Sequence, residues 1–318
     1  LGEYMASRGY GFLGWNTRFR GNEAFFLLEH ALVDIGAGVH WLKEQAGIEQ
    51  VVILGNSGGG SLMGAYQSQA LGVTMTATPG LDIPPTLHDL IPADLYVSLC
   101  AHSGRPEVLT AWLDPSVTDE TDPTSIDPEL NMYDPKNEPP YSEEFISRYR
   151  AAQEARNHRI TAWCHSELER VRRLGMTDRA FNLYRTWADL RLMDGEIDPS
   201  QREVGRCYAG DPSVANFGPR GIGLTNTLRT WLSMWSLQDS HCRGAPHLNR
   251  ISQPALVIQS NADTGVFPSD ARAIFDALAS EDKRLDMIDG DHYLETPEDA
   301  RDNVADLIVA WLRERGAD

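Results

Sequence analysis

The stretch that decides the fold is VVILGNSGGGSLMGAYQ, residues 51–67. Apolar, β-favouring residues lead into a glycine-rich corner around Ser57, and a helical pattern follows without a loop. A strand that turns directly into a helix forces the corner residue into strained backbone angles, and its neighbours must be small. Gly55 and Gly59 occupy these positions on either side of Ser57. The stretch therefore predicts an elbow that exposes the serine hydroxyl and directs the N–H of Gly58 toward an oxyanion.

A glycine loop that binds phosphate at a helix N-terminus is the alternative interpretation of this stretch. No Lys-Ser or Lys-Thr pair follows the glycines, which excludes a P-loop. The GxGxxG pattern of dinucleotide sites is also missing from the stretch. The residues therefore favour the elbow over an anion-binding loop.

A serine nucleophile needs a base that takes its proton and an acid that orients the base. In folds with this elbow the order along the chain is serine, acid, histidine. His292 follows an expected strand near the C-terminus, where a loop residue can reach the elbow. Asp263 ends an earlier expected strand and is the favoured acid. Asp270 is the close competitor, but its position suits the cap of the next helix.

Helices alternate with short apolar strands in the first and last parts of the chain, which indicates a mostly parallel sheet with helices on both faces. The expected strands are residues 10–15, 50–54, 72–80, 254–263 and 284–289. The expected helices are residues 1–9, 22–47, 61–70, 269–280 and 300–316. The fold class predicted by this alternation is α/β.

The alternation stops over residues 83–250. This part contains an acidic, proline-rich surface segment at 113–144 and two expected helices, at 142–175 and 225–238. The sequence therefore predicts a core made of residues 1–82 and 251–318, interrupted by a mainly helical insert.

With the elbow, Asp263 and His292 in this order, the core resembles the α/β-hydrolase fold family. The resemblance implies a serine hydrolase of esters, amides or activated C–C bonds, with a variable lid at the place of the insert. It also implies that a loop after an earlier strand, often marked by His-Gly, supplies a second oxyanion N–H. These N-terminal strands are not found in the sequence, so either the chain is a truncated or processed product or residues 15–18 supply the donor.

The expected function is cleavage of a carboxylic ester by an acyl-enzyme on Ser57, with His292 as base, Asp263 as orienting acid and the Gly58 N–H on the oxyanion. No metal or organic cofactor is required. Two alternatives stay open, namely a C–C bond hydrolase of a diketone-like substrate with the same residues and a non-catalytic binding protein on the same fold. Peptidase activity is disfavoured, because no acidic site for a substrate amino terminus is evident.

Three apolar residues of the insert form a face that can line an acyl or aromatic pocket, namely Trp231, Met234 and Trp235. They point to a small, hydrophobic ester as the substrate. His241, Cys242 and His247 do not match the spacing of common zinc sites, so no metal site is expected.

The composition excludes some partners. The formal net charge of −18 disfavours nucleic acid and anionic membranes, and no apolar run approaches the length of a membrane span. The four cysteines are scattered without CxxC spacing, so reduced, buried thiols are expected. The cytoplasm is the default location, and a homodimer stays open.

Overall fold

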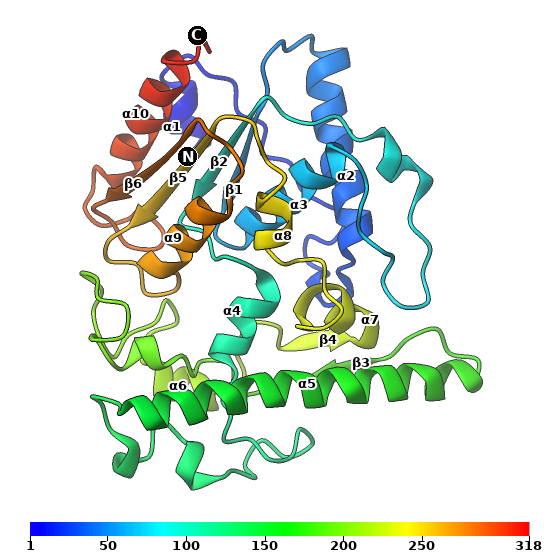
Figure 1. Cartoon of the computed structure of the whole chain (residues 1–318), viewed down its shortest axis with the longest axis vertical. Coiled ribbons are helices and arrows are strands. Elements are labelled where there is room, and N and C mark those ends of the chain that lie inside the picture. Colours follow the sequence, from blue (N-terminus) through cyan, green and yellow to red (C-terminus); the bar gives the residue numbers. More distant parts are fainter. Residues whose placement is uncertain (318) are drawn as a thin grey trace.

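The computed structural model describes residues 1–317 and is built on a parallel sheet with the strand order β1-β2-β5-β6 (Figure 1). The strands are β1 Val52–Asn56, β2 Leu95–Leu99, β5 Ala255–Ser260 and β6 Lys283–Ile288. Val97 in β2 pairs with Leu54 on one side and Leu256 on the other. The interior strands β2 and β5 are buried along their whole length, as expected for a sheet covered on both faces. The predicted α/β class is confirmed.

Helices cover both faces of the sheet (Figure 1). One face carries α1 Gly2–Ala6 and α10 Ala300–Arg313, and the other carries α2 Leu28–His40, α3 Gly58–Ala70, α8 Ala245–Leu248 and α9 Pro268–Ala277. Neighbouring residues of a strand point to opposite faces, so Val97 packs with α10 whereas Tyr96 packs on the α3 side. Short helical turns complete the core at Glu23–Phe25, Trp41–Gln45 and Pro85–Asp89.

Two of the expected strands are wrong, because residues 10–15 and 72–80 have no regular structure. In the second of these segments the N–H groups of Thr74 and Met75 donate to the side chain of Gln69 instead of to a neighbouring strand. The strand that follows α3 in the sheet is β2. Because β2 is an interior strand, the start of the insert predicted at residue 83 is wrong. We propose that the insert lies between β2 and β5.

The segment between β2 and β5 is mainly helical and lies at the carboxyl ends of the strands (Figure 1). Its helices are α4 Arg105–Trp112, α5 Glu143–Arg173, α6 Pro212–Phe217 and α7 Leu228–Thr230, and it returns to the sheet through α8. Short helical turns lie at Pro128–Leu130, Pro135–Asn137, Leu190–Leu192 and Trp231–Trp235. A two-stranded ribbon pairs β3 Ala180–Asn182 with β4 Thr225–Thr227. The long helix expected at 142–175 is confirmed, with the Ser142 hydroxyl capping the Phe145 N–H at 3.2 Å.

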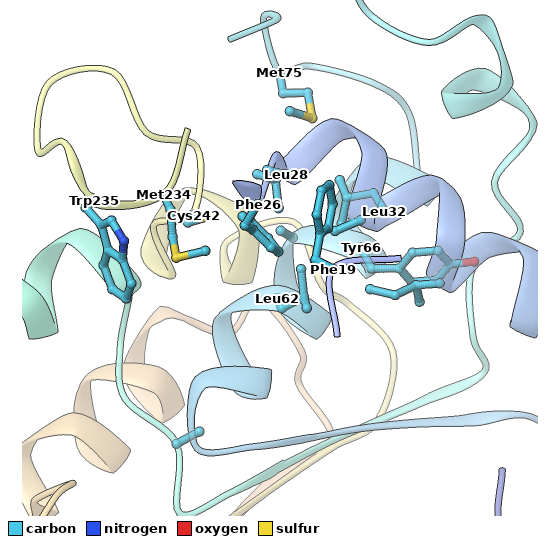
Figure 2. Packing of buried hydrophobic residues seen from close by; sticks show 14 of the residues in the cluster. Phe19, Phe26, Leu28, Leu32, Leu62, Tyr66, Met75, Met234, Trp235 and Cys242 are labelled. Atoms are coloured by element: carbon cyan, nitrogen blue, oxygen red, sulfur yellow. The ribbon is translucent and has the colours of Figure 1, made fainter. Parts of the chain in front are cut away.

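A large apolar cluster joins the N-terminal segment, α2, α3 and the insert (Figure 2). Phe19 and Phe26 pack against each other in it, and Leu62 of α3 and Met234 of the insert belong to the same cluster. All four cysteines are buried and unpaired, in agreement with the expected reduced thiols. Of the helices in residues 1–317, none combines the length and the apolar character that crossing a membrane requires.

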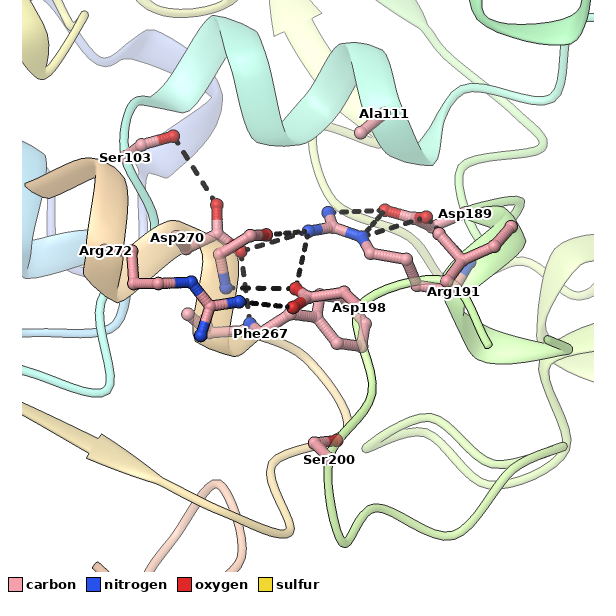
Figure 3. Close-up of polar contacts among 12 residues, drawn as sticks. Ser103, Ala111, Asp189, Arg191, Asp198, Ser200, Phe267, Asp270 and Arg272 are labelled. Carbon is pink, nitrogen blue, oxygen red and sulfur yellow. Dashed lines mark hydrogen bonds and ion pairs between the residues drawn. The ribbon is translucent and has the colours of Figure 1, made fainter. Parts of the chain in front are cut away.

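Arg191 connects the insert to α9 through a buried group of carboxylates (Figure 3). Its guanidinium lies 2.7 Å from Asp189 of the insert and 3.3 Å from Asp270 of α9, and Asp198 lies at 3.8 Å. Burial alone would raise the pKa of Asp189, but Arg191 and Arg150 outweigh it and hold that pKa well below its ordinary value. The network therefore depends on the Arg191 charge.

Arg191→Met should destabilise the protein by about 3 kcal/mol, because it leaves buried carboxylates without their shared cation. The free energy of unfolding in urea measures the loss. Arg272→Met is the matched control, since Arg272 contacts Asp198 of the same group from a half-exposed position. A loss for Arg191→Met no larger than for Arg272→Met would contradict the central role of Arg191.

Candidate active site

Ser57 sits at the corner between β1 and α3 with φ 52° and ψ −122°, a strained conformation for a non-glycine residue. Its N–H donates to the Leu99 carbonyl of β2 at 3.0 Å, which fixes the corner to the neighbouring strand. The helix begins at the next residue, Gly58. The predicted strand–elbow–helix unit is therefore formed around Ser57.

The glycines around Ser57 are required by close contacts, although not all at the expected positions. A Cβ on Gly55 would lie 2.5 Å from the carbonyl oxygen of Gly59, and a Cβ on Gly60 would lie 2.3 Å from Cβ of Ala101. A Cβ on Gly59 would meet nothing within 4 Å. A side chain would therefore clash with its surroundings at Gly55 and Gly60, whereas the expected positions were Gly55 and Gly59.

The structure brings Ser57, His292 and Asp263 together at the carboxyl end of the sheet. Ser57 Oγ lies 3.2 Å from His292 Nε2, and His292 Nδ1 lies 2.8 Å from Asp263 Oδ2. Asp263 follows β5 and His292 follows β6, so neighbouring parallel strands deliver the two side chains to one edge. The imidazole thus contacts the serine hydroxyl with one nitrogen and the carboxylate with the other, which is the geometry that activation of a serine requires.

The Asp263 carboxylate is held by the backbone as well as by His292. Its Oδ1 accepts the N–H groups of Gly265 and Val266 at 2.7 and 2.9 Å, and the residue is 1% exposed. His292 Nδ1 lies 3.0 Å from this Oδ1 and 2.8 Å from Oδ2, so Oδ2, which has no backbone donor, makes the shorter contact with the imidazole. The competing acid Asp270 instead accepts from the Phe267 N–H and from Arg191, which places it in the network of Figure 3.

An aromatic side chain of the insert covers the imidazole. The ring of Tyr208 stacks on His292 with centroids 5.6 Å apart and planes 20° apart, and Tyr293 meets the same imidazole edge-on at 5.0 Å. Tyr208 is itself packed against Trp187 at 4.8 Å and Trp112 at 5.7 Å. Tyr208 could not be predicted from the sequence as a neighbour of His292, because it lies in an irregular segment that carries no motif.

A cavity of about 680 Å³ lies between the N-terminal segment, α3 and the insert. Neither Ser57 nor His292 lines it, and it reaches the elbow through Arg105, which donates to the Gly58 carbonyl. Met234 and Trp235, two of the residues predicted to line a substrate pocket, line this cavity, and Figure 2 shows Met234 between Trp235 and Phe26. Trp231 does not line the cavity. It is fully buried, and its Nε1 donates to the Thr161 hydroxyl of α5 at 3.0 Å. The expected binding role of Trp231 is therefore corrected to a role in core packing.

The segment expected to supply a second oxyanion donor is tied to α2. The Trp15 indole N–H donates to the Asp34 carbonyl at 2.7 Å, and the backbone N–H of Arg18 donates to the Asp34 carboxylate at 2.8 Å. Asn16 and Thr17, which lie between them, line the cavity. The segment therefore forms a wall of the cavity.

Two residues that follow β2 lie beside Gly58 and were not singled out from the sequence. The Arg105 guanidinium donates to the Gly58 carbonyl at 2.9 Å, and a Cβ on Gly58 would lie 3.6 Å from Nε2 of His102. Burial, with the charge of Arg105 in addition, lowers the pKa of His102 to about 3, so this imidazole is neutral at pH 7. Recognition of β2 as a strand would have pointed to both residues, because residues just after a parallel strand lie at the edge where such sheets bind ligands.

The comparisons with known proteins found likenesses among solved structures. The match with the esterase domain of a Rhodothermus marinus protein covers 98% of this chain and 78% of the esterase chain, with 12% identity and a TM-score of 0.44. The match with the monoacylglycerol lipase of Paleococcus ferrophilus covers 90% of this chain and 75% of the lipase chain, with 17% identity and a TM-score of 0.40. The match with a structure from work on the metagenome-derived lipolytic enzymes LipS and LipT covers 98% of this chain and 86% of the other chain, with 13% identity and a TM-score of 0.46.

No family model matches the chain, and no curated protein matches it. With identities and TM-scores as low as those of the solved structures, the assignment of the fold rests on the chain's own features. These are the order of the parallel strands, the elbow at Ser57 and the two loops that carry Asp263 and His292.

Proposed function

Because the chain has the α/β-hydrolase fold, we propose that it is a serine hydrolase that cleaves a carboxylic ester through an acyl-enzyme on Ser57. The observation that carries the proposal is the continuous series of contacts from Ser57 Oγ through His292 to Asp263. The cavity that Arg105 connects with the elbow, with Phe26, Leu62, Met234 and Trp235 in its walls, supports a small-molecule substrate.

In the first half of the reaction, His292 Nε2 takes the hydroxyl proton while Ser57 Oγ attacks the carbonyl carbon of the ester. The carbonyl oxygen becomes an oxyanion, and the Gly58 N–H at the start of α3 stabilises it. Asp263 stabilises the imidazolium that has formed. His292 then gives its proton to the leaving alcohol, and the acyl group remains on Ser57.

In the second half, His292 takes a proton from a water molecule as the water oxygen attacks the acyl carbon. The second oxyanion forms at the same position and collapses with release of the carboxylic acid. The proton on His292 returns to Ser57 Oγ, which restores the starting state. We further propose that the insert acts as the lid of the site, since it contributes both the cover on His292 and one wall of the cavity.

Labelling with a fluorophosphonate tests the proposal. We expect one adduct on Ser57, located by intact mass and peptide mapping, because the reagent reacts with an activated serine and not with a surface hydroxyl. The adduct should be absent from Ser57→Ala and should form far more slowly on His292→Ala. Ser269→Ala is the control, since that serine lies outside the site and should not affect labelling.

A panel of aryl esters and of vinylogous diketones then identifies the scissile bond. Turnover of esters supports the proposed function, and turnover of diketones alone would replace it with C–C bond hydrolysis by the same residues. The lack of any adduct on Ser57 would show that the serine is not activated and would overturn the proposal.

A further inference from the structure

Arg105 is a cation beside the elbow without a carboxylate partner. Within residues 1–317 no Asp or Glu oxygen lies within ion-pair distance of its guanidinium. Among the buried arginines of the insert, Arg185 pairs with Asp114 at 2.6 Å, whereas Arg202 also lacks a carboxylate partner but donates to four backbone carbonyls. The partly buried Arg105 differs from both, because it has neither a carboxylate nor such a set of oxygen acceptors.

The contacts that Arg105 does make are weak for a charged group. One nitrogen donates to the Gly58 carbonyl at 2.9 Å, and another meets the thioether of Met234 at 3.6 Å. The guanidinium also lies 5.5 Å from the Phe26 ring and 6.0 Å from the Trp235 ring. Its Nε is buried without an acceptor, so hydrogen-bonding capacity is left over.

Removal of a guanidinium from water without an anionic partner is unfavourable. Burial accordingly lowers the pKa of the Arg105 guanidinium below its ordinary value. A charge kept in such a place at the expense of stability is characteristic of a functional position.

Arg105 also connects the cavity with the elbow, because it lines the first and contacts Gly58 in the second. It lines the cavity together with Leu62, Met234 and Trp235. Its bond to the Gly58 carbonyl places it within about 7 Å of the Gly58 N–H by standard backbone dimensions. The N-terminus of α3 adds a positive partial charge to the same region.

The acidic residue on the cavity wall does not neutralise Arg105. Glu23 lines the cavity, but its carboxylate accepts the N–H of Gly21 at 2.8 Å and belongs to its own turn. The cavity thus has walls of mixed polar and apolar residues and two arginines, of which Arg20 is exposed and the partly buried Arg105 is the one that contacts Gly58.

We propose that Arg105 binds a carboxylate of the substrate, so that the ester cleaved by this chain carries an anionic group a few bonds from the scissile carbonyl. The inference rests on the proposed function, because it places that group relative to Ser57 and Gly58. A carboxylate would accept from the free donors of the guanidinium in a medium of low polarity, where a charge-assisted hydrogen bond is strongest.

Matched substrates test this assignment. The 4-nitrophenyl monoester of glutarate ends in a carboxylate, and 4-nitrophenyl methyl glutarate has the same chain with a neutral end. We expect wild type to prefer the first by at least about 10-fold in kcat/KM, because a hydrogen bond to a charged group is worth a factor of this order. This comparison needs no variant.

Variants of Arg105 separate binding from support of the elbow. Arg105→Met should lower kcat/KM for the charged ester about 10- to 100-fold and change it little for the neutral ester, and Arg105→Lys should restore part of the preference. Arg284→Met removes the same charge from the distant strand β6 and is the control. Equal losses for both esters in Arg105→Met would show that Arg105 only holds Gly58, and would overturn the assignment.

A binding measurement keeps the test independent of turnover. Calorimetric titration of Ser57→Ala with monoethyl glutarate should show binding that Arg105→Met removes, and diethyl glutarate should bind equally weakly to both proteins. If Ser57 is labelled and esters are cleaved without any preference for the charged ester, the assignment of Arg105 fails and the proposed function stands. If no ester is cleaved but monoethyl glutarate binds through Arg105, the anion site stands and the proposed function fails.

Discussion

Ser57→Ala, His292→Ala and the double variant should all lose about the same factor in kcat for ester cleavage, about 10⁶-fold. The reason is that the hydroxyl and the imidazole act on one proton, with Oγ and Nε2 3.2 Å apart. Without the base the serine stays a poor nucleophile, and without the nucleophile the base has no proton to take. The second substitution therefore causes no further loss of kcat, because the first has already removed the contribution that the two side chains make together.

The measurement is kcat with a 4-nitrophenyl ester for the three proteins and for wild type. His158→Ala is the matched control, because His158 is exposed on α5 and should leave kcat within a few-fold of wild type. Losses that add up in the double variant would mean that Ser57 and His292 act independently, and they would contradict the mechanism. Residual activity above the uncatalysed rate is expected, since the Gly58 N–H and the cavity remain.

The elbow and its partners could be predicted from the sequence because each depends on local chemistry. The corner at Ser57 requires small neighbours within a few residues, and this requirement is visible as a glycine cluster. Asp263 and His292 each follow a short apolar strand in the order that the fold imposes on its catalytic groups. Such signals do not depend on the packing of distant segments.

The central strand β2 could not be recognised in the same way. Leu95–Leu99 is buried on both faces, so it shows no alternation, and it follows an irregular stretch that contains prolines. Residues 72–80 contain Val73 and three threonines, which favour β structure, but the N–H groups of Thr74 and Met75 are bonded by the side chain of Gln69. Missing β2 also meant missing His102 and Arg105, which lie at its carboxyl end.

Side chains of the insert depend on which segments it packs against. Trp231 and Trp235 have the spacing of one helical turn, yet one lies against α5 and the other lines the cavity. The stacking of Tyr208 on His292 joins residues far apart in the sequence. Spacing alone cannot distinguish a face that meets a helix from one that meets a cavity.

Asp263→Asn should lower kcat about 10⁴-fold while changing the stability of the fold much less. Asp263 Oδ1 accepts two backbone N–H groups, so the amide oxygen of an asparagine should take this position and turn its NH₂ toward His292. An NH₂ group can only donate, which forces Nδ1 to be the unprotonated nitrogen and places the imidazole proton on Nε2. Nε2 faces Ser57 Oγ and could then no longer accept its proton.

The readouts for this variant are kcat with a 4-nitrophenyl ester and the free energy of unfolding in urea. Asp289→Asn makes the same chemical change at an exposed residue three positions before His292 and should leave kcat near wild type. A variant at Asp263 that retained more than about a tenth of kcat would show that the carboxylate does not set the imidazole tautomer. A large loss of stability together with the loss of activity would instead show that Asp263 mainly holds the loop at Gly265 and Val266. The N–H groups of that loop are bonded to Oδ1, and these bonds do not involve the imidazole.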